Sequence, residues 1–355
     1  MQVRQFAEHQ RRALVDFQVE TLPGVQLGQR QVPVERVGAY VPAGRLPMLA
    51  SPFMTILVAK VAGVERVVAC SPPRDGRGIH PPVLHSIATS GADAIFALGG
   101  VQALAAMAFG IEDLGPVDML VGPGNAFVAE AKRQLFGRVG IDLLAGPSEI
   151  TVLADETADP ELVAADLLAQ AEHGPTSPAI LVTTDETLAE RLVKEIDRQL
   201  DELAALGADE IPRRAWTDHG AAILVSSAED AIRVVDGLAP EHLEVQTGRD
   251  DWYFDRLRSY GSVFLGSQAT VAFSDKAIGT NHTLPTAGAA RYTGGLSVAK
   301  YLKTLTYQRI VSEVGVEAIA PVVAEISRAD LMPAHEASAT RRLTRLSHGQ
   351  GSRRN

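Results

Sequence analysis

Apolar and polar residues alternate in blocks along the chain, and the blocks have the lengths of strands and helices. Short runs rich in Val, Ile and Leu, bounded by Gly, Pro or Asp, are typical of buried strands in a parallel sheet. The longer blocks between them have the apolar spacing of helices. In the first part of the chain this pattern predicts strands from Val37 and over 66–70, 94–98, 118–121 and 139–143, and helices over 53–61, after Pro82, after Gly100 and over 126–135.

A second series of the same kind follows. It predicts strands near 150–153, 179–183, 222–226 and 262–265, separated by helices that include the long segment 186–206. Strands that alternate with helices form a parallel sheet with helices on both faces. We therefore predict an α/β fold with two Rossmann-like parallel-sheet domains. The last part is predicted to be helical, over 308–326 and from Asp330 onward, with a basic tail that we expect to be disordered.

Composition and charge restrict the class of protein. With 355 residues, 46% of them hydrophobic, the chain can bury a large core in two or more domains. A net charge of −10 disfavours nucleic acid or an anionic membrane as a partner. We find neither a signal-peptide pattern nor an apolar run of the roughly 18 residues that span a membrane. Cys70, the one cysteine, ends an apolar strand, so we interpret it as a buried structural thiol in a cytoplasmic protein.

The segment Gln-Ala-Glu-His-Gly-Pro, from Gln170, ends an apolar helix. Asp159 and Pro160 start this helix as its cap and first-turn proline, and Gly174-Pro175 stops it. Gln170 and His173 are three positions apart, so they share one face at the helix end. A histidine near a helix end is often only a cap or a satisfied buried side chain. A functional interpretation therefore depends on other segments.

Three further segments place polar residues beside predicted element ends, where site residues are commonly carried. They are Pro240-Glu241-His242-Leu243, Ser274-Asp275-Lys276 with its continuation to Asn281-His282, and Ala334-His335-Glu336. Zinc binds imidazole nitrogen and carboxylate oxygen, and a catalytic zinc keeps a position open for water or substrate. His173, Asp275 and His335 suit such a site.

Short motifs along the chain form an ordered series. They are Gly38-Ala39-Tyr40-Val41-Pro42-Ala43-Gly44, Lys60-Val61-Ala62-Gly63, Ala69-Cys70-Ser71-Pro72-Pro73, Gly99-Gly100-Val101-Gln102-Ala103, Gly122-Pro123-Gly124-Asn125, Ala145-Gly146-Pro147-Ser148-Glu149, Gln170-Ala171-Glu172-His173, Pro240-Glu241-His242-Leu243 and Gly279-Thr280-Asn281-His282. With them the chain resembles the histidinol dehydrogenase family from about Gln5 to about Leu346. Other segments look more like the sulfopropanediol 3-dehydrogenase branch of that family: Gly44-Arg45, the segment from Leu135 to Asp142, the segment from Tyr292 to Val298, and the segment from Lys303 to Gln308.

The resemblance implies a domain organisation and two cofactors. It implies an NAD-binding Rossmann-like domain over 40–148, a zinc- and substrate-binding one over 1–39 and 149–295, and a helical dimerisation segment with a disordered tail over 296–355. In the family this last segment crosses to the partner of an intertwined homodimer, which implies that His335 reaches the partner's site. One zinc per subunit and NAD are the implied cofactors, and a small alcohol is the implied substrate.

Site residues follow from the resemblance position by position. It implies zinc ligands at Gln170, His173, Asp275 and His335, NAD contacts at Tyr40, Gln102 and Asn125, substrate contacts at Ser148, His242, His282 and Asp330, and the acid/base pair Glu241 and His242. The glycine turn before Asn125 lacks the third glycine of the dinucleotide fingerprint. A tight strand-to-helix turn explains that segment equally well, although glycines that open a helix also leave N–H groups for a pyrophosphate.

The chemistry of two oxidations fits the acid/base pair. A primary alcohol needs a base of near-neutral pKa to take its proton while hydride leaves to NAD, and His242 suits that role. The aldehyde must then add water before the second hydride leaves, and a desolvated Glu241 can activate that water. An ordinary solvent-facing pair at a strand start is the alternative for these two residues.

The substrate and two other functions stay open. At Asp330 the family commonly has a glutamate, one methylene longer, so the substrate pocket can differ. Arg45 offers a charge to a sulfonate or carboxylate, or a surface ion pair. We expect oxidation of histidinol or a related small polar alcohol to the carboxylate, with 2,3-dihydroxypropane-1-sulfonate as the alternative substrate. A catalytically inactive ligand-binding homologue is the alternative of another class, and a zinc hydrolase would leave the NAD motifs without a role.

Overall fold

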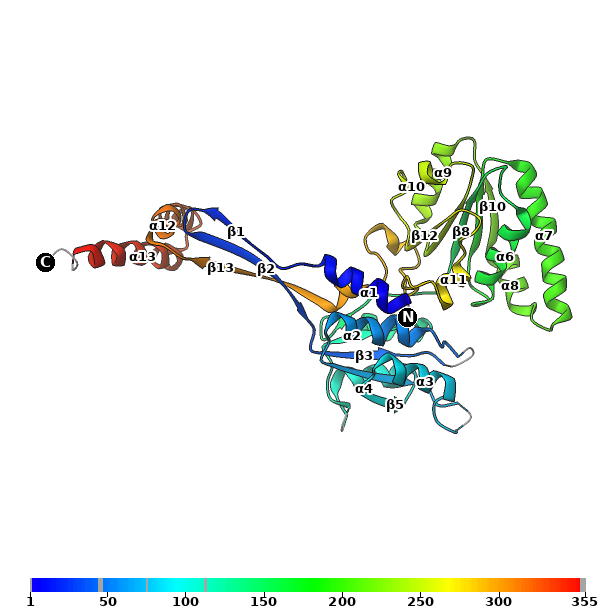
Figure 1. The fold of residues 1–355 in the computed structure, drawn as a ribbon, viewed down its shortest axis with the longest axis horizontal. Helices are drawn as coiled ribbons and strands as arrows, with labels where there is room; N and C mark the ends of the chain where they lie inside the picture. The colour runs from blue at the N-terminus through cyan, green and yellow to red at the C-terminus, as the bar shows by residue number, and fades with distance from the viewer. Residues whose placement is uncertain (1, 44–46, 75, 112–113, 352–355) are drawn as a thin grey trace. The chain divides into compact units, whose positions relative to one another are not determined.

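The computed structural model describes residues 2–43, 47–74, 76–111 and 114–351. Contacts within the chain divide it into two units, shown as ribbons in Figure 1. The first unit comprises residues 1–11 and 33–301, and the second comprises residues 12–32 and 302–355. Helix α1 (Gln2–Ala13) opens the chain.

Five parallel strands form one sheet of the first unit, in the order β5-β4-β3-β6-β7. They are β3 (Arg36–Tyr40), β4 (Arg66–Ser71), β5 (Ala94–Ala97), β6 (Met119–Val121) and β7 (Gly140–Ile141). The connecting helices are a π-helical turn (Phe53–Leu57) that continues into α2 (Val58–Ala62), then α3 (Pro81–Ser90), α4 (Gly100–Phe109) and α5 (Ala126–Leu135). The chain runs outward from β3 to β5 and returns to β6, so the strand order reverses between β3 and β6.

The core of this sheet is apolar on the side covered by α4 and α5. Leu104 and Met107 of α4 and Val128 of α5 pack against Leu120 of the sheet. Cys70 lies in the same core with no exposed surface, and burial raises the pKa of its thiol to about 12. The prediction of a buried structural thiol is confirmed.

A second five-stranded parallel sheet has the order β10-β9-β8-β11-β12. Its strands are β8 (Ile150–Ala154), β9 (Ala179–Thr183), β10 (Gly220–Leu224), β11 (His242–Gln246) and β12 (Ser262–Leu265). Its helices are α6 (Pro160–Ala171), α7 (Glu186–Ala205), α8 (Glu210–His219), α9 (Ala228–Leu238), α10 (Asp250–Phe254) and α11 (Val271–Lys276). Two 3-10 helices follow, Ala289–Arg291 and Val298–Tyr301.

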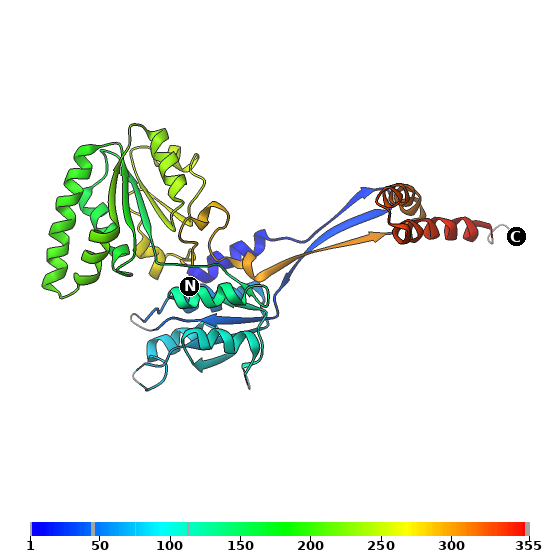
Figure 2. The same ribbon diagram turned by 180° about the vertical axis from the view of Figure 1, so that it is seen from behind.

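Helices cover both faces of this sheet, as the two opposite views in Figures 1 and 2 show. Along β8, Ile150 and Val152 join the core under α6 and α7, whereas Leu153 joins the core under α9 and α10. This alternation is the period-two pattern of a strand buried on both faces. The predicted α/β class with two Rossmann-like parallel sheets is confirmed.

Strand β11 is absent from the strands predicted above, although it pairs with β8 and β12. Its sequence His-Leu-Glu-Val-Gln is not an apolar run, because Glu244 and Gln246 are polar. Both side chains are nevertheless buried and hydrogen-bonded. The apolar pattern therefore did not predict this strand, because its polar residues are buried with hydrogen-bond partners that only the folded chain provides.

The second unit contains a three-stranded sheet in the order β1-β2-β13 and two helices. Its elements are β1 (Phe17–Leu22), β2 (Val25–Pro33), β13 (Leu302–Ile310), α12 (Glu313–Ala329) and α13 (Pro333–Gly351). The prediction of a helix from residue 308 was wrong at its start, since residues 308–310 are in β13 and Ser312 is the N-cap of α12. Thr and Tyr residues in β13 favour a strand, and the strand pairs with β2. The end of the basic tail, 352–355, lies outside the described residues.

The predicted domain boundary lies between residues 39 and 40. Strand β3 runs from Arg36 to Tyr40, so residues on both sides of that boundary belong to the first sheet. The predicted domain ranges stay a prediction.

Within the part of the chain that the structure describes, no helix is both long and apolar enough to cross a membrane.

Candidate active site

Glu241 and His242 lie at the amino-terminal edge of the second sheet. His242 is the first residue of β11, in register with Ile150 of β8 and Ser262 of β12. Ala239 has a left-handed backbone, with φ of 49°, and ends α9 just before the pair. Only 5% of Glu241 and 2% of His242 is exposed, so the two residues do not form a solvent-facing pair.

The backbone of Glu149, which precedes β8, holds both side chains. Its N–H donates a hydrogen bond to Oε2 of Glu241 at 3.0 Å, and its carbonyl oxygen lies 3.2 Å from Nδ1 of His242. A carbonyl oxygen only accepts, so Nδ1 carries the proton in this contact and Nε2 offers its lone pair. Nε2 is buried and has no hydrogen-bond partner among the described residues. Nε2 of His242 can therefore accept a proton or a hydrogen bond from a bound molecule.

Burial shifts the pKa values of the pair in opposite directions. Desolvation raises the pKa of Glu241 well above its usual range, and the nearby carboxylates of Glu149 and Asp275 raise it further. Desolvation lowers the pKa of His242 to about 4, although Asp275 opposes that shift. His242 is therefore neutral at pH 7 and can act as a base. Glu241 is a stronger base than an exposed carboxylate whenever it is ionised.

Helix α6 carries Gln170 in its last turn. Asp159 caps the helix start, accepting the N–H of Glu161 at 3.0 Å, as the sequence predicts. The helix ends at Ala171, and His173 follows in a turn in which its N–H donates to the carbonyl oxygen of Gln170 at 3.1 Å. Gln170 is 1% exposed, and neither atom of its amide has a hydrogen-bond partner among the described residues. A buried amide without partners is costly, which indicates a missing ligand.

Asp275, in α11, lies between two histidines. Its Oδ2 is 3.4 Å from Nε2 of His173, and its Oδ1 is 3.7 Å from Nδ1 of His282. The same His282 nitrogen lies 3.2 Å from the carbonyl oxygen of Asp275. Burial raises the pKa of Asp275, but the hydrogen bond from His173 and the charges of the neighbouring imidazoles lower it, overall to about 2. Asp275 is therefore a carboxylate throughout the physiological pH range.

The residues around Asp275 offer the kinds of donor atom that a metal ion binds. In the described ranges no group of three or more His, Cys, Asp or Glu side chains has the arrangement of a ready metal centre. The donors present still fit zinc in kind. Gln170 offers a buried amide oxygen without a partner among the described residues, and the imidazole of His173 lies 3.4 Å from the ionised carboxylate of Asp275. The fourth predicted ligand, His335, lies in the second unit near the start of α13, where its side chain is exposed.

The predicted substrate residues are divided between the units. Ser148 makes a side-chain hydrogen bond to Glu241, so it belongs with the acid/base pair. The side chain of His282 is 7% exposed, its Nε2 has no partner among the described residues, and desolvation lowers its pKa. Asp330 is the exposed C-cap of α12 in the second unit. Arg45 lies outside the described residues.

The predicted NAD residues lie at carboxyl ends of strands in the first sheet. Tyr40 ends β3, and its hydroxyl accepts the N–H of Gly100 at 3.2 Å at the start of α4, two residues before Gln102. Asn125 follows β6 and caps α5, accepting the N–H groups of Phe127 and Val128 at 3.1 Å each. The neighbours β3 and β6 flank the point where the strand order reverses, which is where open α/β sheets bind ligands. This position in the sheet fits a dinucleotide.

Several known proteins are similar to this chain over most of its length. A profile of the family described as Histidinol dehydrogenase matches residues 1–343. A protein named Histidinol dehydrogenase homolog from Shouchella clausii is 53% identical over 97% of this chain and 80% of its own length. Sulfopropanediol 3-dehydrogenase from Ruegeria pomeroyi is 49% identical over 97% of this chain and 78% of its own length. The crystal structure of histidinol dehydrogenase from Elizabethkingia anophelis superposes with a TM-score of 0.92, at 36% identity, covering 98% of this chain and 78% of that one.

The chain belongs to the histidinol dehydrogenase family. Membership confirms the resemblance derived from the sequence motifs. Histidinol dehydrogenases are oxidoreductases that act on CH–OH groups, and this is the class of reaction to which the family assigns the chain. The relatives named above include enzymes with different substrate names.

Sequence reasoning missed several polar residues that support the site. Glu149 was noted only as part of a motif, yet its backbone holds Glu241 and His242, and its carboxylate accepts the N–H of Ala287 at 3.0 Å. Ala287 has φ of 53°, a strained value for a residue other than glycine. Such a contact joins segments 138 residues apart in the sequence. A charged residue at the start of a buried strand is the only signal that the sequence offers for it.

Glu244 and Asp166 form a second, deeper pair of carboxyl groups. Glu244 accepts the N–H of Val271 at 3.1 Å, at the start of α11, and contacts Asp166 of α6. Thr270 donates to Asp166 at 2.7 Å. The strand neighbours of Glu244 on β8 and β12 are apolar, Val152 and Phe264. Desolvation and then Asp166 raise the pKa of Glu244 well above its usual range, so Glu244 keeps its proton to a higher pH than an exposed glutamate does.

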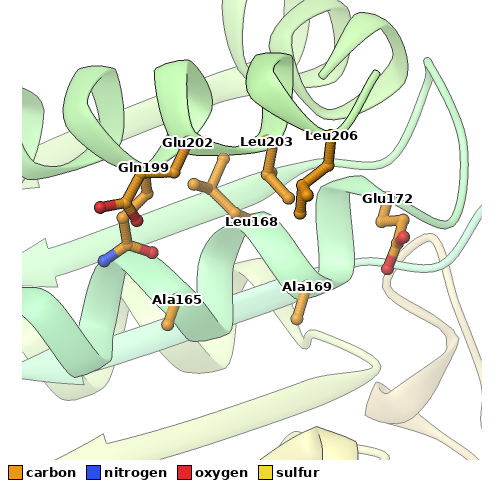
Figure 3. Close-up of a pocket in the computed structure, with 8 residues that line it drawn as sticks. All are labelled: Ala165, Leu168, Ala169, Glu172, Gln199, Glu202, Leu203 and Leu206. Carbon is orange, nitrogen blue, oxygen red and sulfur yellow. The ribbon is translucent and has the colours of Figure 1, made fainter. Parts of the chain in front are cut away.

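A groove of about 350 Å³ lies between α6 and α7 (Figure 3), away from these residues. It is lined by Ala165, Leu168, Ala169, Glu172, Gln199, Glu202, Leu203 and Leu206. The α6 residues among them form a different face of the helix from that of Asp166 and Gln170. None of them is a predicted site residue, so the groove is not part of the candidate active site.

Proposed function

We propose that this chain is a zinc- and NAD-dependent dehydrogenase that oxidises a primary alcohol through its aldehyde to a carboxylate. The observation that carries the proposal is the His242 ring. Its Nδ1–H is directed to the carbonyl oxygen of Glu149, Nδ1 lies 3.6 Å from Oε2 of Glu241, and Nε2 is buried without a partner among the described residues. A neutral imidazole in this tautomer accepts a proton at Nε2. Membership of the histidinol dehydrogenase family supports the reaction class.

In the first oxidation His242 acts on the alcohol. Its Nε2 takes the hydroxyl proton as the C–H bond breaks, and NAD, when bound, would supply the acceptor for the hydride. The product is an aldehyde, NADH and a proton on His242. Tyr40, Gln102 and Asn125 are the residues that would hold the dinucleotide.

In the second oxidation Glu241 acts on water. Its carboxylate takes a proton from water as the water oxygen bonds to the aldehyde carbon, and the former carbonyl oxygen takes a proton from solvent, which gives the hydrate. His242, after losing its first proton to solvent, takes the hydroxyl proton of the hydrate as the second C–H bond breaks, and a second NAD would accept that hydride. The product is the carboxylic acid. Ser148, which bonds to Glu241, would keep that carboxyl oriented.

Gln170, His173 and Asp275, with His335, would hold the zinc. When bound, zinc supplies a Lewis-acidic contact that orients the polar groups of the alcohol. The unpartnered amide of Gln170 and the ionised Asp275 support this role. His282, with a buried and unpaired Nε2, would contact the substrate.

We further propose that the protein acts as a homodimer in which His335 completes the partner's site. The second unit exposes apolar side chains on its strands and helices: Phe17, Val19, Leu27, Leu305, Ile310, Val314, Val322, Ile326 and Leu331. Exposed apolar surface of this kind is typical of an interface. Closed two-fold assembly would cover it in both chains at once.

Histidinol, or a related small polar alcohol, is the proposed substrate, and 2,3-dihydroxypropane-1-sulfonate is the second candidate. The second is favoured by the similarity to a protein named sulfopropanediol 3-dehydrogenase at 49% identity, against 46% for a named histidinol dehydrogenase from Zymomonas mobilis. The two alcohols differ in charge, since one carries an imidazole and an amine and the other a sulfonate. Asp330 bears on the choice because it is shorter than the glutamate common in the family.

The test is NADH formation with a panel of alcohols, with these two foremost. We expect two NADH per alcohol consumed and little free aldehyde. A zinc- and NAD-binding protein that forms no NADH with any member of the panel would instead support a catalytically inactive ligand-binding homologue. Product analysis would identify the carboxylate.

A further inference from the structure

A buried ion pair lies under the glycine turn of the first sheet. Lys132 of α5 and Asp142, which follows β7, form a salt bridge, and they are 2% and 4% exposed. A charged pair removed from water gains little net stability, because desolvation offsets most of the attraction. Such a pair can instead fix the orientation of neighbouring groups, through the hydrogen bonds that each partner makes.

Both partners bind the main chain of one residue, Gly122. Its N–H donates to Oδ2 of Asp142 at 2.8 Å, and its carbonyl oxygen accepts from Nζ of Lys132 at 3.0 Å. The other oxygen of Asp142 accepts the N–H of Leu143 at 2.7 Å, which anchors the aspartate to its own segment. The ion pair therefore fixes the orientation of the peptide groups on both sides of Gly122.

Gly122 sets the course of the turn from β6 into α5. Its φ is 118°, and a Cβ there would lie 2.1 Å from the carbonyl oxygen of Tyr40. The turn ends at Asn125, the cap of α5. In the dinucleotide fingerprint a third glycine lets the helix pack closely against the strand. This turn lacks that glycine, so close packing at a glycine does not fix the position of α5 here.

We propose that Lys132 and Asp142 are positioning residues for the dinucleotide: the buried pair holds the turn from Gly122 to Asn125 in the shape that NAD binds. The inference rests on the proposed function, since it assumes that this turn receives NAD. Both side chains are buried, so we assign them no direct contact with the cofactor. They act through Gly122, and the loss of either releases one of its two main-chain hydrogen bonds.

The experiment measures NADH binding at equilibrium, by the fluorescence of the nicotinamide and by calorimetry, in Asp142→Asn and Lys132→Met. Asp142→Asn keeps the shape and removes the charge, and Lys132→Met keeps the aliphatic stem. We expect the Kd for NADH to rise about 10-fold or more in each. The KM for NAD should rise in parallel, with zinc content unchanged and the KM for the alcohol within about twofold of the wild type.

Glu130→Gln is the matched control, because Glu130 and Arg133 form an exposed ion pair on the same helix. It should leave NADH binding unchanged. The double variant Lys132→Met/Asp142→Leu replaces the pair by apolar side chains, which a buried site commonly tolerates. It covers the case in which a single variant leaves an unpaired buried charge and fails to fold.

The outcomes separate two failures. Weak NADH binding by folded variants, with an unchanged alcohol KM, supports the positioning role. Wild-type NADH binding by folded variants overturns it and leaves the proposed function standing. A wild-type protein that binds zinc but no dinucleotide overturns both.

Discussion

Nδ1 of His242 lies 3.2 Å from the main-chain oxygen of Glu149, while Nε2 of the same ring has no hydrogen-bond partner among the described residues. This relationship selects one tautomer of the ring and leaves the other nitrogen for a proton from the substrate. Because the acceptor is a backbone carbonyl, it can accept this hydrogen bond at any pH.

Replacing His242 should therefore depress both oxidations. We expect His242→Ala to lower the single-turnover rate with alcohol and with aldehyde by about 10²–10⁴. Burial lowers the pKa of His242 to about 4, so the base is lost only as the pH falls towards that value. The pH profile of kcat/KM for the alcohol tests this. His219→Ala, at an exposed histidine of α8, is the control and should behave as the wild type.

Replacing Glu241 should separate the two steps. Glu241→Gln keeps the size of the side chain and removes the base, so aldehyde oxidation should slow by about 10² or more while alcohol oxidation stays measurable. Desolvation raises the pKa of Glu241, so the carboxylate fraction and the second step should rise with pH in the wild type. Glu241→Gln should lack that rise. Equal slowing of both steps in single-turnover measurements would contradict this division of labour.

Removing a predicted zinc ligand should remove metal and activity together. Elemental analysis of the wild type purified without chelators should give one zinc per subunit. His173→Ala and Asp275→Ala should lose it, because each removes a donor from the pair whose atoms lie 3.4 Å apart. A wild type that contains no stoichiometric metal and is not activated by added zinc would rule out the site.

Two inactive variants should complement one another if the site is shared between subunits. We expect His173→Ala and His335→Ala to be inactive alone and to regain activity when mixed under conditions of subunit exchange. Heterodimers would then contain one intact site. Exchange shown by mass without any return of activity would count against a shared site.

Glu244 should link stability to pH through its own proton. Its folded pKa is raised above the unfolded value, so the stabilisation is present at low pH and is lost as the pH rises through the raised pKa. Glu244→Gln is neutral at every pH, and the thermal midpoint of that variant should fall less with rising pH. Glu244→Leu leaves the Val271 N–H unpaired and should cost about 1–3 kcal/mol at all pH values. Equal pH slopes in the wild type and Glu244→Gln would contradict a raised pKa of Glu244.

Local signals predicted much of the fold. The bounds of α5 and the cap at Asp159 follow from short-range patterns, and the structure has both as predicted. Strand β11 was missed because Glu244 and Gln246 gain their partners only in the folded chain. The start of α12 was misplaced because the pairing of β13 with β2 joins segments far apart in sequence.

The candidate site was predictable where motifs carry it and not where distant contacts do. Gln170, His173 and Asp275 were identified from motifs, and the structure brings His173 and Asp275 to 3.4 Å. The orientation of the His242 ring depends on Glu149, 93 residues away, and no pattern near His242 indicates that contact. Lys132 reads in the sequence as an ordinary helix-surface lysine, although it is buried.

Cys70 has a practical consequence for the experiments above. It is the single cysteine of the chain, it has no exposed surface, and its thiol stays protonated at ordinary pH. Maleimides and other thiol reagents react with accessible thiolates, so the native protein should resist them. One cysteine introduced at an exposed position, such as Val193 on α7, would then be the sole labelled site. Subunit exchange could be followed with two dyes on otherwise native chains, without first removing a thiol from the core.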